Sequence, residues 1–207
     1  NLPMLFEYLS DNDIATVITL HDCWFYTGKC THYTSDQCFK WKNGCENCSK
    51  LKVDNKSWFF DRTHKMWNDK YRWYNSIPRL AVVGVSDWIT HEAKLSILKS
   101  AKIVERIYNS IDLECFTPVN NYKKLIDGFD NEFIILGVAS GWSEKKGLQV
   151  FLELSKYLKD DEKIFLVGRM PDIKLPENII HIEATESIEE LVRYYNRADV
   201  FLQLSKE

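Results

Sequence analysis

The sequence predicts an α/β fold of two domains, each with a parallel sheet flanked by helices. Three observations support this prediction. Apolar, strand-like runs alternate with helical patterns through both halves of the chain. The strand-like runs end abruptly in short polar loops. A polar stretch with only a weak apolar pattern, residues 119–132, separates the halves. We therefore expect a first domain at 1–118, a linker at 119–132 and a second domain at 133–207.

The clearest strand–loop–helix unit is residues 133–148, FIILGVASGWSEKKGL. Residues 133–138 are β-branched or otherwise apolar, which is typical of a buried strand. Apolar residues spaced three or four apart from Leu148 onward predict a helix with one buried face. Lys145 and Lys146 lie between the two, and lysines beside the N–H groups of a helix start suit a phosphate. The plainer interpretation is a solvated turn.

The same criteria give the remaining elements. Strands are expected at residues 15–20, 80–85, 103–107, 163–168, 178–182 and 200–202. Helices are expected at residues 2–9, 57–74, 88–100, 148–158 and 188–197. The aromatic stripe of the second helix fits a buried core better than a platform for sugar stacking. Its members are Phe60, His64, Trp67 and Tyr71.

Composition is ordinary for a globular protein, with 45% hydrophobic and 28% charged residues over 207 positions. The net charge of −3 gives no general attraction to nucleic acid, although residues 29–72 are locally basic and aromatic. No apolar run approaches the ~20 residues of a membrane span. No signal peptide is visible.

Four cysteines mark a segment without clear apolar periodicity, in the order Cys30-x7-Cys38-x6-Cys45-x2-Cys48. A CxxC pair is a frequent half of a zinc site, and two further cysteines would complete a tetrahedron. Zinc fits a reducing compartment and disulfides fit an oxidising one. Four free thiols are the third alternative. Cys23 and Cys115 adjoin buried-looking segments and are expected in the core.

His21 follows the strand at 15–20 directly, where α/β folds place ligands. It is a candidate to face a substrate. The alternative is a histidine that only satisfies hydrogen bonds of its loop.

Six motifs carry a family resemblance: TLHDCW, VVGVSDWI, IYNSIDLECFTP, ILGVASGWSEKKGL, IFLVG and YYNRADVFLQLSKE. Together they resemble, in order and over nearly the whole chain, the GT-B glycosyltransferases of family 4. These are retaining enzymes with two Rossmann-like domains that close over a cleft and use nucleotide sugars. The cysteine-rich insert, residues 29–56, resembles that of the capsular or exopolysaccharide subgroup.

The resemblance implies a role for particular residues. His21 matches a catalytic histidine near the donor sugar, and Glu207 lies at or next to the first carboxylate of an E-x7-E motif. The donor-binding residues implied are Ser140, Lys145, Lys146 and Thr185. Catalysis needs no metal in this family, so a zinc ion at the cysteines would be structural.

The same resemblance implies two partners, a nucleotide-sugar donor and a glycan or lipid-linked acceptor. It implies no binding of nucleic acid. The expected location is the cytoplasm, with peripheral contact at the inner face of the membrane left open. The family's first strand, its glycine-rich loop and the second glutamate of E-x7-E are missing, so we expect a truncated chain, inactive alone. The arginine common near Ser140 is also absent, which leaves Lys145 to supply its charge.

Two other functions remain open. One is a sugar-nucleotide epimerase of related fold, which would not need the cysteine insert. The other is a non-catalytic zinc or nucleic-acid module built on the basic segment at 29–72, which would bind in a salt-sensitive way.

Overall fold

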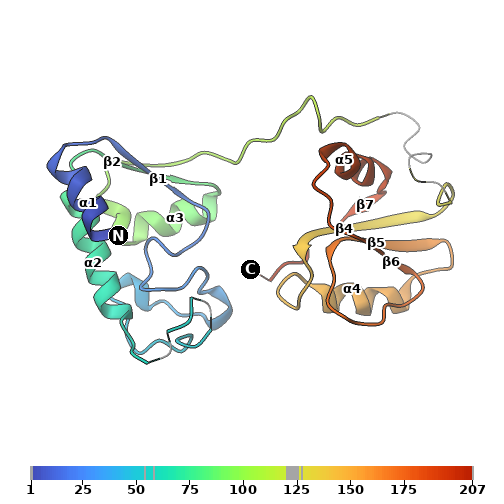
Figure 1. Cartoon of the computed structure of the whole chain (residues 1–207), viewed down its shortest axis with the longest axis horizontal. Helices are drawn as coiled ribbons and strands as arrows, with labels where there is room; N and C mark the ends of the chain where they lie inside the picture. Colours follow the sequence, from blue (N-terminus) through green and yellow to red (C-terminus); the bar gives the residue numbers. More distant parts are fainter. Residues whose placement is uncertain (1, 54, 58, 120–125, 127, 207) are drawn as a thin grey trace. The chain divides into compact units, whose positions relative to one another are not determined.

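The computed structural model describes residues 2–53, 55–57, 59–119, 126 and 128–206. Two compact units divide the chain, Asn1–Ser110 (unit 1) and Ile111–Glu207 (unit 2) (Figure 1). Much of the expected linker, residues 120–125 and 127, lies outside the described residues, as does Glu207.

Residues 111–118, assigned to the first domain by sequence, belong to unit 2 in this division. Their contacts with a later helix explain this. The Phe116 ring lies 6.2 Å from the Tyr195 ring. The Asn196 side chain donates to the Thr117 carbonyl at 3.1 Å and accepts from the Val119 N–H at 2.8 Å.

Unit 1 contains a three-stranded parallel sheet in the order β1-β2-β3. Its strands are β1 (Thr16–Leu20), β2 (Leu80–Gly84) and β3 (Ile103–Arg106). Its helices are α1 (Leu2–Asp11), α2 (Thr63–Ser76) and α3 (Asp87–Leu95). A 3₁₀ turn, Ile97–Ser100, completes the segment for which the sequence predicts a single helix.

One face of this sheet carries the core of unit 1. Ile18, Leu20, Leu80 and Val82 are buried in one cluster, whereas Val17, which points to the other face, is 64% exposed. Alternate residues of a strand point to opposite faces, so this pattern follows directly from the strand period. Because the three strands are parallel, the polar loops that follow them lie at the same edge of the sheet.

Of the aromatic stripe expected to be buried on α2, only Trp67 packs against the core of unit 1, and it is partly buried. Phe60 is 69% exposed and precedes the helix, and Tyr71 is 47% exposed. The helix begins at Thr63, and the residues that it buries are Thr63, Asp69, Lys70 and Tyr74. The sequence pattern misplaced the helix start, and it did not indicate that α2 buries polar side chains beside Tyr74.

Unit 2 contains a four-stranded parallel sheet in the order β6-β5-β4-β7. The strands are β4 (Phe133–Gly141), β5 (Glu162–Arg169), β6 (Ile179–Ile182) and β7 (Val200–Phe201). The helices are α4 (Leu148–Leu154), followed by a 3₁₀ turn at Ser155–Tyr157, and α5 (Ile188–Arg197). The predicted α/β class, with parallel sheets flanked by helices, is confirmed.

Both faces of the second sheet are buried. Ile135 of β4 packs in the cluster that contains Phe151 of α4, whereas Ile134 and Leu136 pack in a separate cluster beside Tyr194 of α5. The two helices accordingly lie on opposite sides of the sheet (Figure 1). A strand buried on both faces reads as a continuous apolar run, which is why β4 was clear in the sequence.

The strand order places a topological switch point at β4. The chain proceeds outward from β4 through β5 to β6 and then returns to form β7 on the other side of β4. Open α/β sheets bind ligands outside the carboxyl ends of the strands at such a point. No helix in the described part of the chain combines the length and the apolar character needed to cross a bilayer.

Two glycines of β4 provide a test of packing between the sheet and α4. A Cβ added at Gly137 would lie 2.7 Å from Phe151 and 2.8 Å from Trp142, whereas one at Gly141 would have no atom closer than 4.0 Å. We expect Gly137→Ala to lower the free energy of unfolding by about 1–3 kcal/mol through overpacking. Gly141→Ala, the matched control, should change it little. Urea unfolding of both variants measures the difference, and equal stabilities would contradict this packing.

Candidate functional site

The loop after β4 and the segment after β7 contact each other at the switch point. The Lys206 N–H donates to the Lys145 carbonyl at 2.9 Å, and the Lys206 ammonium lies 2.7 Å from the Glu144 carboxylate. A Cβ added at Gly147 would lie only 2.4 Å from the Leu204 carbonyl oxygen. The close approach of these two segments therefore requires glycine at this position.

Trp142 anchors the β4 loop to the core of unit 2. Its side chain is buried, its indole N–H donates to the Val167 carbonyl at 3.2 Å, and its ring lies edge-on to Phe151 at 5.3 Å. The sequence pattern alone had placed Trp142 in a polar loop. The anchored loop leaves Lys145 exposed and Lys146 half-buried at the carboxyl edge of the sheet.

The turn at residues 143–147 leads directly into α4. The N–H groups of Lys146 and Leu148 both donate to the Ser143 carbonyl at 3.1 Å. Gly147 has φ +79° and precedes the helix without a side-chain cap. Because α4 has only seven residues, the lysines rather than the helix terminus supply most of the positive charge here.

Arg169 adds a cation at this edge that the sequence motifs did not single out. It is the last residue of β5, and its Nε donates to the Ser140 carbonyl at 3.1 Å across an irregularity between Val138 and Gly141. The Trp142 N–H in turn donates to the Arg169 carbonyl at 2.8 Å. The sequence signal was available, since Arg169 directly follows a predicted strand.

Thr185 lies between β6 and α5, two strands away from β4. Its hydroxyl donates to the Glu190 carboxylate and accepts from the Ser187 N–H at 3.1 Å. Hydrogen bonds from Thr185 and Tyr194 lower the pKa of Glu190. The Thr185 side chain is thus bound to the N-terminal turn of α5.

His21 directly follows β1 in unit 1 and is exposed. Its imidazole makes no hydrogen bond to another residue that the structure describes. The loop beyond it is held by its neighbours: Asp22 accepts from the Trp24 N–H at 2.7 Å, and the Cys23 N–H donates to the Thr31 carbonyl at 2.7 Å. The chain beside His21 is therefore ordered without using His21.

Lys70 of α2 supports this loop, a role that the sequence did not reveal. The side chain is fully buried, and its ammonium donates to the carbonyls of Trp24 and Thr27 while lying 3.5 Å from the centre of the Trp24 ring. Burial lowers the pKa of Lys70 to about 7, whereas the ring and the two carbonyls favour its charged form.

The four cysteines of the insert line one small pocket in unit 1. None of the six cysteines of the chain, each within the described part, forms a disulfide. Within the described residues, no three His, Cys, Asp or Glu side chains are arranged so that they could hold a metal ion. Burial raises the pKa of Cys30 to about 12 and that of Cys45 to about 11.

The two remaining cysteines differ in environment. Cys23 is fully buried in the core of unit 1, as expected. The expectation of a buried Cys115 is wrong: this thiol is exposed and donates to the Asp112 carboxylate at 3.2 Å. It follows a turn in which Asp112 also accepts from the Glu114 N–H, so hydrogen bonding, and not a core, positions it.

An apolar pocket of about 480 Å³ also lies in unit 2. Ile111, Phe116 and Pro118 line one part of it, and Leu191 and Tyr195 of α5 line another. None of the predicted site residues lines this pocket. The chemistry expected from the sequence thus lies at the carboxyl edges of the sheets and not in this cavity.

Comparison with known proteins identifies the fold. No protein-family model matches the chain, and no curated protein matches it. Among solved structures, a complex of Anabaena HepE with UDP and glucose matches 98% of this chain at 15% identity, with a TM-score of 0.54. Sucrose-phosphate synthase from Thermosynechococcus elongatus matches 75% of it at 18% identity, with a TM-score of 0.52.

These matches cover 51% of the HepE chain and 41% of the synthase chain. The chain therefore spans about half of their length. At these identities the likeness concerns the fold alone, and it agrees with the predicted α/β architecture of parallel sheets flanked by helices.

Lys70 provides a test of how the loop beside His21 is held. Lys70→Met should lower the free energy of unfolding by about 2 kcal/mol or more, because two buried carbonyls lose their donor. Lys94→Met, on α3 and with an exposed side chain, is the control and should change it little. Denaturant unfolding followed by tryptophan fluorescence reports the effect. Wild-type stability of Lys70→Met would rule out this anchoring role.

Proposed function

We propose that this chain is part of a retaining glycosyltransferase of family 4. It would transfer a sugar from a nucleotide-sugar donor to a glycan or lipid-linked acceptor in cell-surface polysaccharide synthesis. The observation that carries the proposal is the group of cations at the switch point of unit 2. Lys145 and Lys146 come from the β4 loop, and Arg169 ends the neighbouring strand.

The fold supports a nucleotide sugar as the donor. The HepE structure of the same fold contains UDP and glucose. A switch point is where such sheets bind nucleotides. The family resemblance of the 133–148 motif independently suggests that Lys146 contacts the donor diphosphate.

The chemistry requires positive charge at this place. When the sugar leaves the nucleotide, negative charge grows on the diphosphate, and fixed cations that meet it stabilise the transition state more than the ground state. Lys145 and Lys146 can supply this charge without a metal. Arg169 is our proposed replacement for the arginine that is absent near Ser140, because its side chain extends from β5 and donates to the Ser140 carbonyl.

His21 and Glu207 complete the proposed machinery by resemblance. His21 would lie near the donor sugar, for which an exposed position after β1 is suited. Glu207 follows Lys206, whose backbone N–H donates to the Lys145 carbonyl in the loop after β4. We further propose a cytoplasmic enzyme, with peripheral contact at the membrane if its acceptor is lipid-linked.

The proposed role of the loop that carries Lys145 and Lys146 can be tested by measuring the affinity for nucleotide sugars. Isothermal titration of the whole chain with UDP-, GDP- and dTDP-sugars should identify one preferred nucleotide. Lys146→Ala should weaken its affinity about tenfold, equivalent to about 1.4 kcal/mol, and Lys145→Ala and Arg169→Ala should each have a smaller effect. Lys163→Ala is the matched control, because Lys163 lies at the opposite end of β5 and donates to the Asp160 carbonyl. Equal affinities in all four variants would contradict a diphosphate site at this edge.

The proposed catalytic role of His21 can be tested in a longer, active enzyme that contains this chain. His21→Ala should reduce turnover by ~10²-fold or more while leaving the melting temperature unchanged, because the side chain is exposed. His91→Ala, an exposed histidine of α3, is the control. The anomeric configuration of the product, read by NMR, tests retention. A melting temperature that falls while activity persists would make His21 structural, and epimerised nucleotide sugar would favour an epimerase.

A further inference from the structure

The four cysteines of the insert converge on a pocket of ion size. Cys30, Cys38, Cys45 and Cys48 all line it, and its volume is about 20 Å³. A water molecule needs roughly 10–15 Å³ measured in this way. The pocket thus has room for one small ion and not for an organic ligand.

The backbone turns immediately before three of the four thiols. Gln37, Gly44 and Asn47 have φ values of 47°, 130° and 46°, and each directly precedes a cysteine. Positive φ is uncommon for residues other than glycine and carries a conformational cost. Each of these reversals precedes a cysteine, and Cys38, Cys45 and Cys48 all line the same pocket although the chain between them is irregular.

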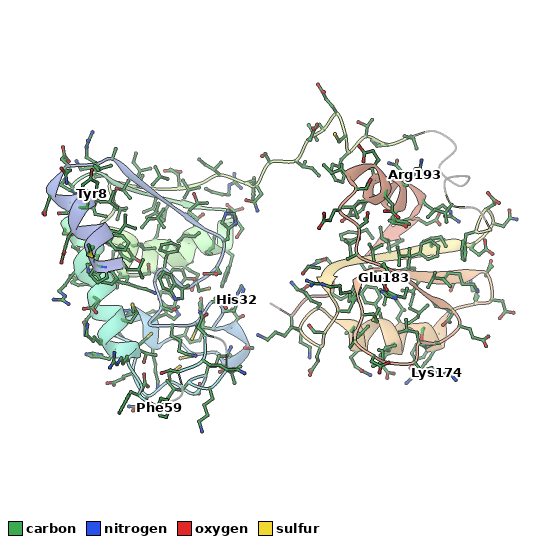
Figure 2. The ribbon with its side chains drawn as sticks, in the orientation of Figure 1. Tyr8, His32, Phe59, Lys174, Glu183 and Arg193 are labelled. Carbon is green, nitrogen blue, oxygen red and sulfur yellow. The ribbon has the colours of Figure 1, made fainter. Side chains whose placement is uncertain are left out.

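Aromatic packing holds the insert in position around the pocket. Trp41, in a 3₁₀ turn between Cys38 and Cys45, is buried with its ring 5.0 Å from Tyr26 and 5.3 Å from Tyr33. In contrast, Phe59, labelled in Figure 2, is 86% exposed near the end of the insert. Trp41 therefore fixes the cysteine-bearing turns to the core of unit 1.

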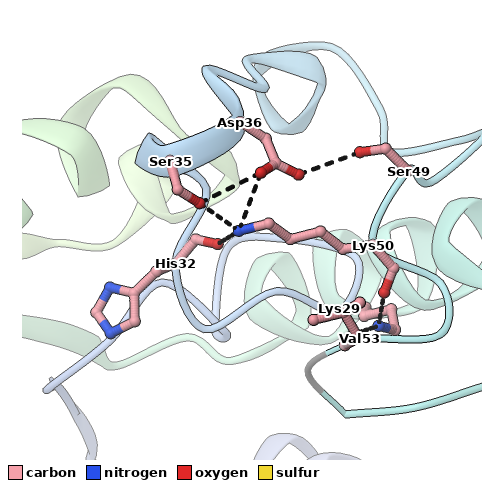
Figure 3. A network of polar contacts seen from close by, with 7 residues as sticks. All are labelled: Lys29, His32, Ser35, Asp36, Ser49, Lys50 and Val53. Carbon is pink, nitrogen blue, oxygen red and sulfur yellow. Dashed lines mark hydrogen bonds and ion pairs between the residues drawn. The ribbon is translucent and has the colours of Figure 1, made fainter. Parts of the chain in front are cut away.

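Two cationic side chains and one acidic side chain line the pocket beside the thiols. They are Lys29, Lys40 and Glu46. The Lys40 ammonium donates to the Glu46 and Asn47 carbonyls at 3.0 Å, inside the Cys45-x2-Cys48 turn. The buried Lys29 donates to the Lys50 and Val53 carbonyls at 2.6 and 2.7 Å (Figure 3). Four thiolates around a divalent cation carry a net charge of −2, which two neighbouring ammonium groups offset.

One thiol already accepts a backbone hydrogen bond. The Gly28 N–H donates to Cys45 Sγ at 3.1 Å. Hydrogen bonds of this kind orient metal ligands and stabilise their charge. Gly28 also admits no side chain, since an added Cβ would lie 2.5 Å from the Thr63 carbonyl.

From these observations we propose that the four cysteines bind one structural zinc ion. The sulfurs would need to rotate about their Cα–Cβ bonds, because no three of the described side chains are arranged as ligands. Rotation between staggered rotamers costs far less free energy than the binding of a structural zinc ion supplies. Four thiolates leave no open coordination position, so the ion does not take part in catalysis.

The proposed zinc ion would help to hold the loop that follows His21. Cys30 and Gly28 belong to the segment that continues from His21, and Gly28 contacts Cys45 directly. Zinc would therefore fix the far end of the loop whose near end Lys70 holds through the Trp24 and Thr27 carbonyls.

Metal content and thiol protection of the whole chain, purified under reducing conditions, test the proposal. We expect about one zinc per chain, and four thiols that react with an alkylating reagent only after zinc is chelated. Replacement with Co²⁺ should give the absorption of a tetrahedral thiolate complex. Chelation should lower the melting temperature of unit 1.

Matched variants complete the experiment. Cys45→Ser should lose most of the zinc, whereas Cys115→Ser, which removes an exposed thiol in unit 2, should retain all of it. If Cys45→Ser fails to fold, the wild-type zinc content and thiol protection still decide the question. A metal-free chain with four reactive thiols would overturn the proposal, and so would a metal-free chain with two disulfides.

Discussion

The structure of unit 2 depends on the burial of β4 on both of its faces. Ile134 and Leu136 pack toward α5, and Ile135 packs toward α4. A strand with two apolar faces needs a neighbour on each edge as well, because its backbone polar groups are removed from water. β5 covers one edge and β7 the other. The chain therefore adds strands on one side of β4 and then returns to add β7 on the other side. This change of side creates the switch point, where the loop that carries Lys145 and Lys146 meets residues 202–206.

Three buried cations among the described residues organise the irregular segments, and all three act on backbone carbonyls. Lys29 donates to Lys50 and Val53, and Lys70 donates to Trp24 and Thr27. Arg197, fully buried at the end of α5, donates to the carbonyls of Phe129 and Glu132. A cation that satisfies two carbonyls removes the main obstacle to burying a loop, which is unpaired backbone. Long loops can thus keep a defined shape without regular secondary structure.

The side chains that we propose to contact the donor are different from the buried side chains that hold them in place. The residues that we propose to contact the donor, Lys145, Lys146 and Arg169, lie at an edge and are at least partly accessible. Trp142 and Phe151 behind them are buried and hold the loop in place. In unit 1, His21 is exposed while Lys70 and the cysteine insert fix the chain beyond it. A rigid support for exposed polar groups is what positioning for group transfer requires.

Local sequence determined the regular elements. Continuous apolar runs located the strands, and the helix expected at residues 188–197 has the bounds of α5. His21 and the loop that carries Lys145 and Lys146 were assigned correctly to strand ends, because the order of elements along the chain is a local property. The spacing of the four cysteines was by itself enough to single out the insert, since closely spaced cysteines are a local signal.

Tertiary structure decided what depends on contacts between distant residues. No pattern near Lys70 indicates that its ammonium lies under Trp24, forty-six positions away, or that Arg169 reaches Ser140 from the next strand. The α2 stripe and Cys115 were misassigned because apolar character does not tell which face of a helix or turn meets a core. Long polar side chains can be buried wherever the fold provides carbonyl acceptors, and only the folded chain shows where these acceptors lie.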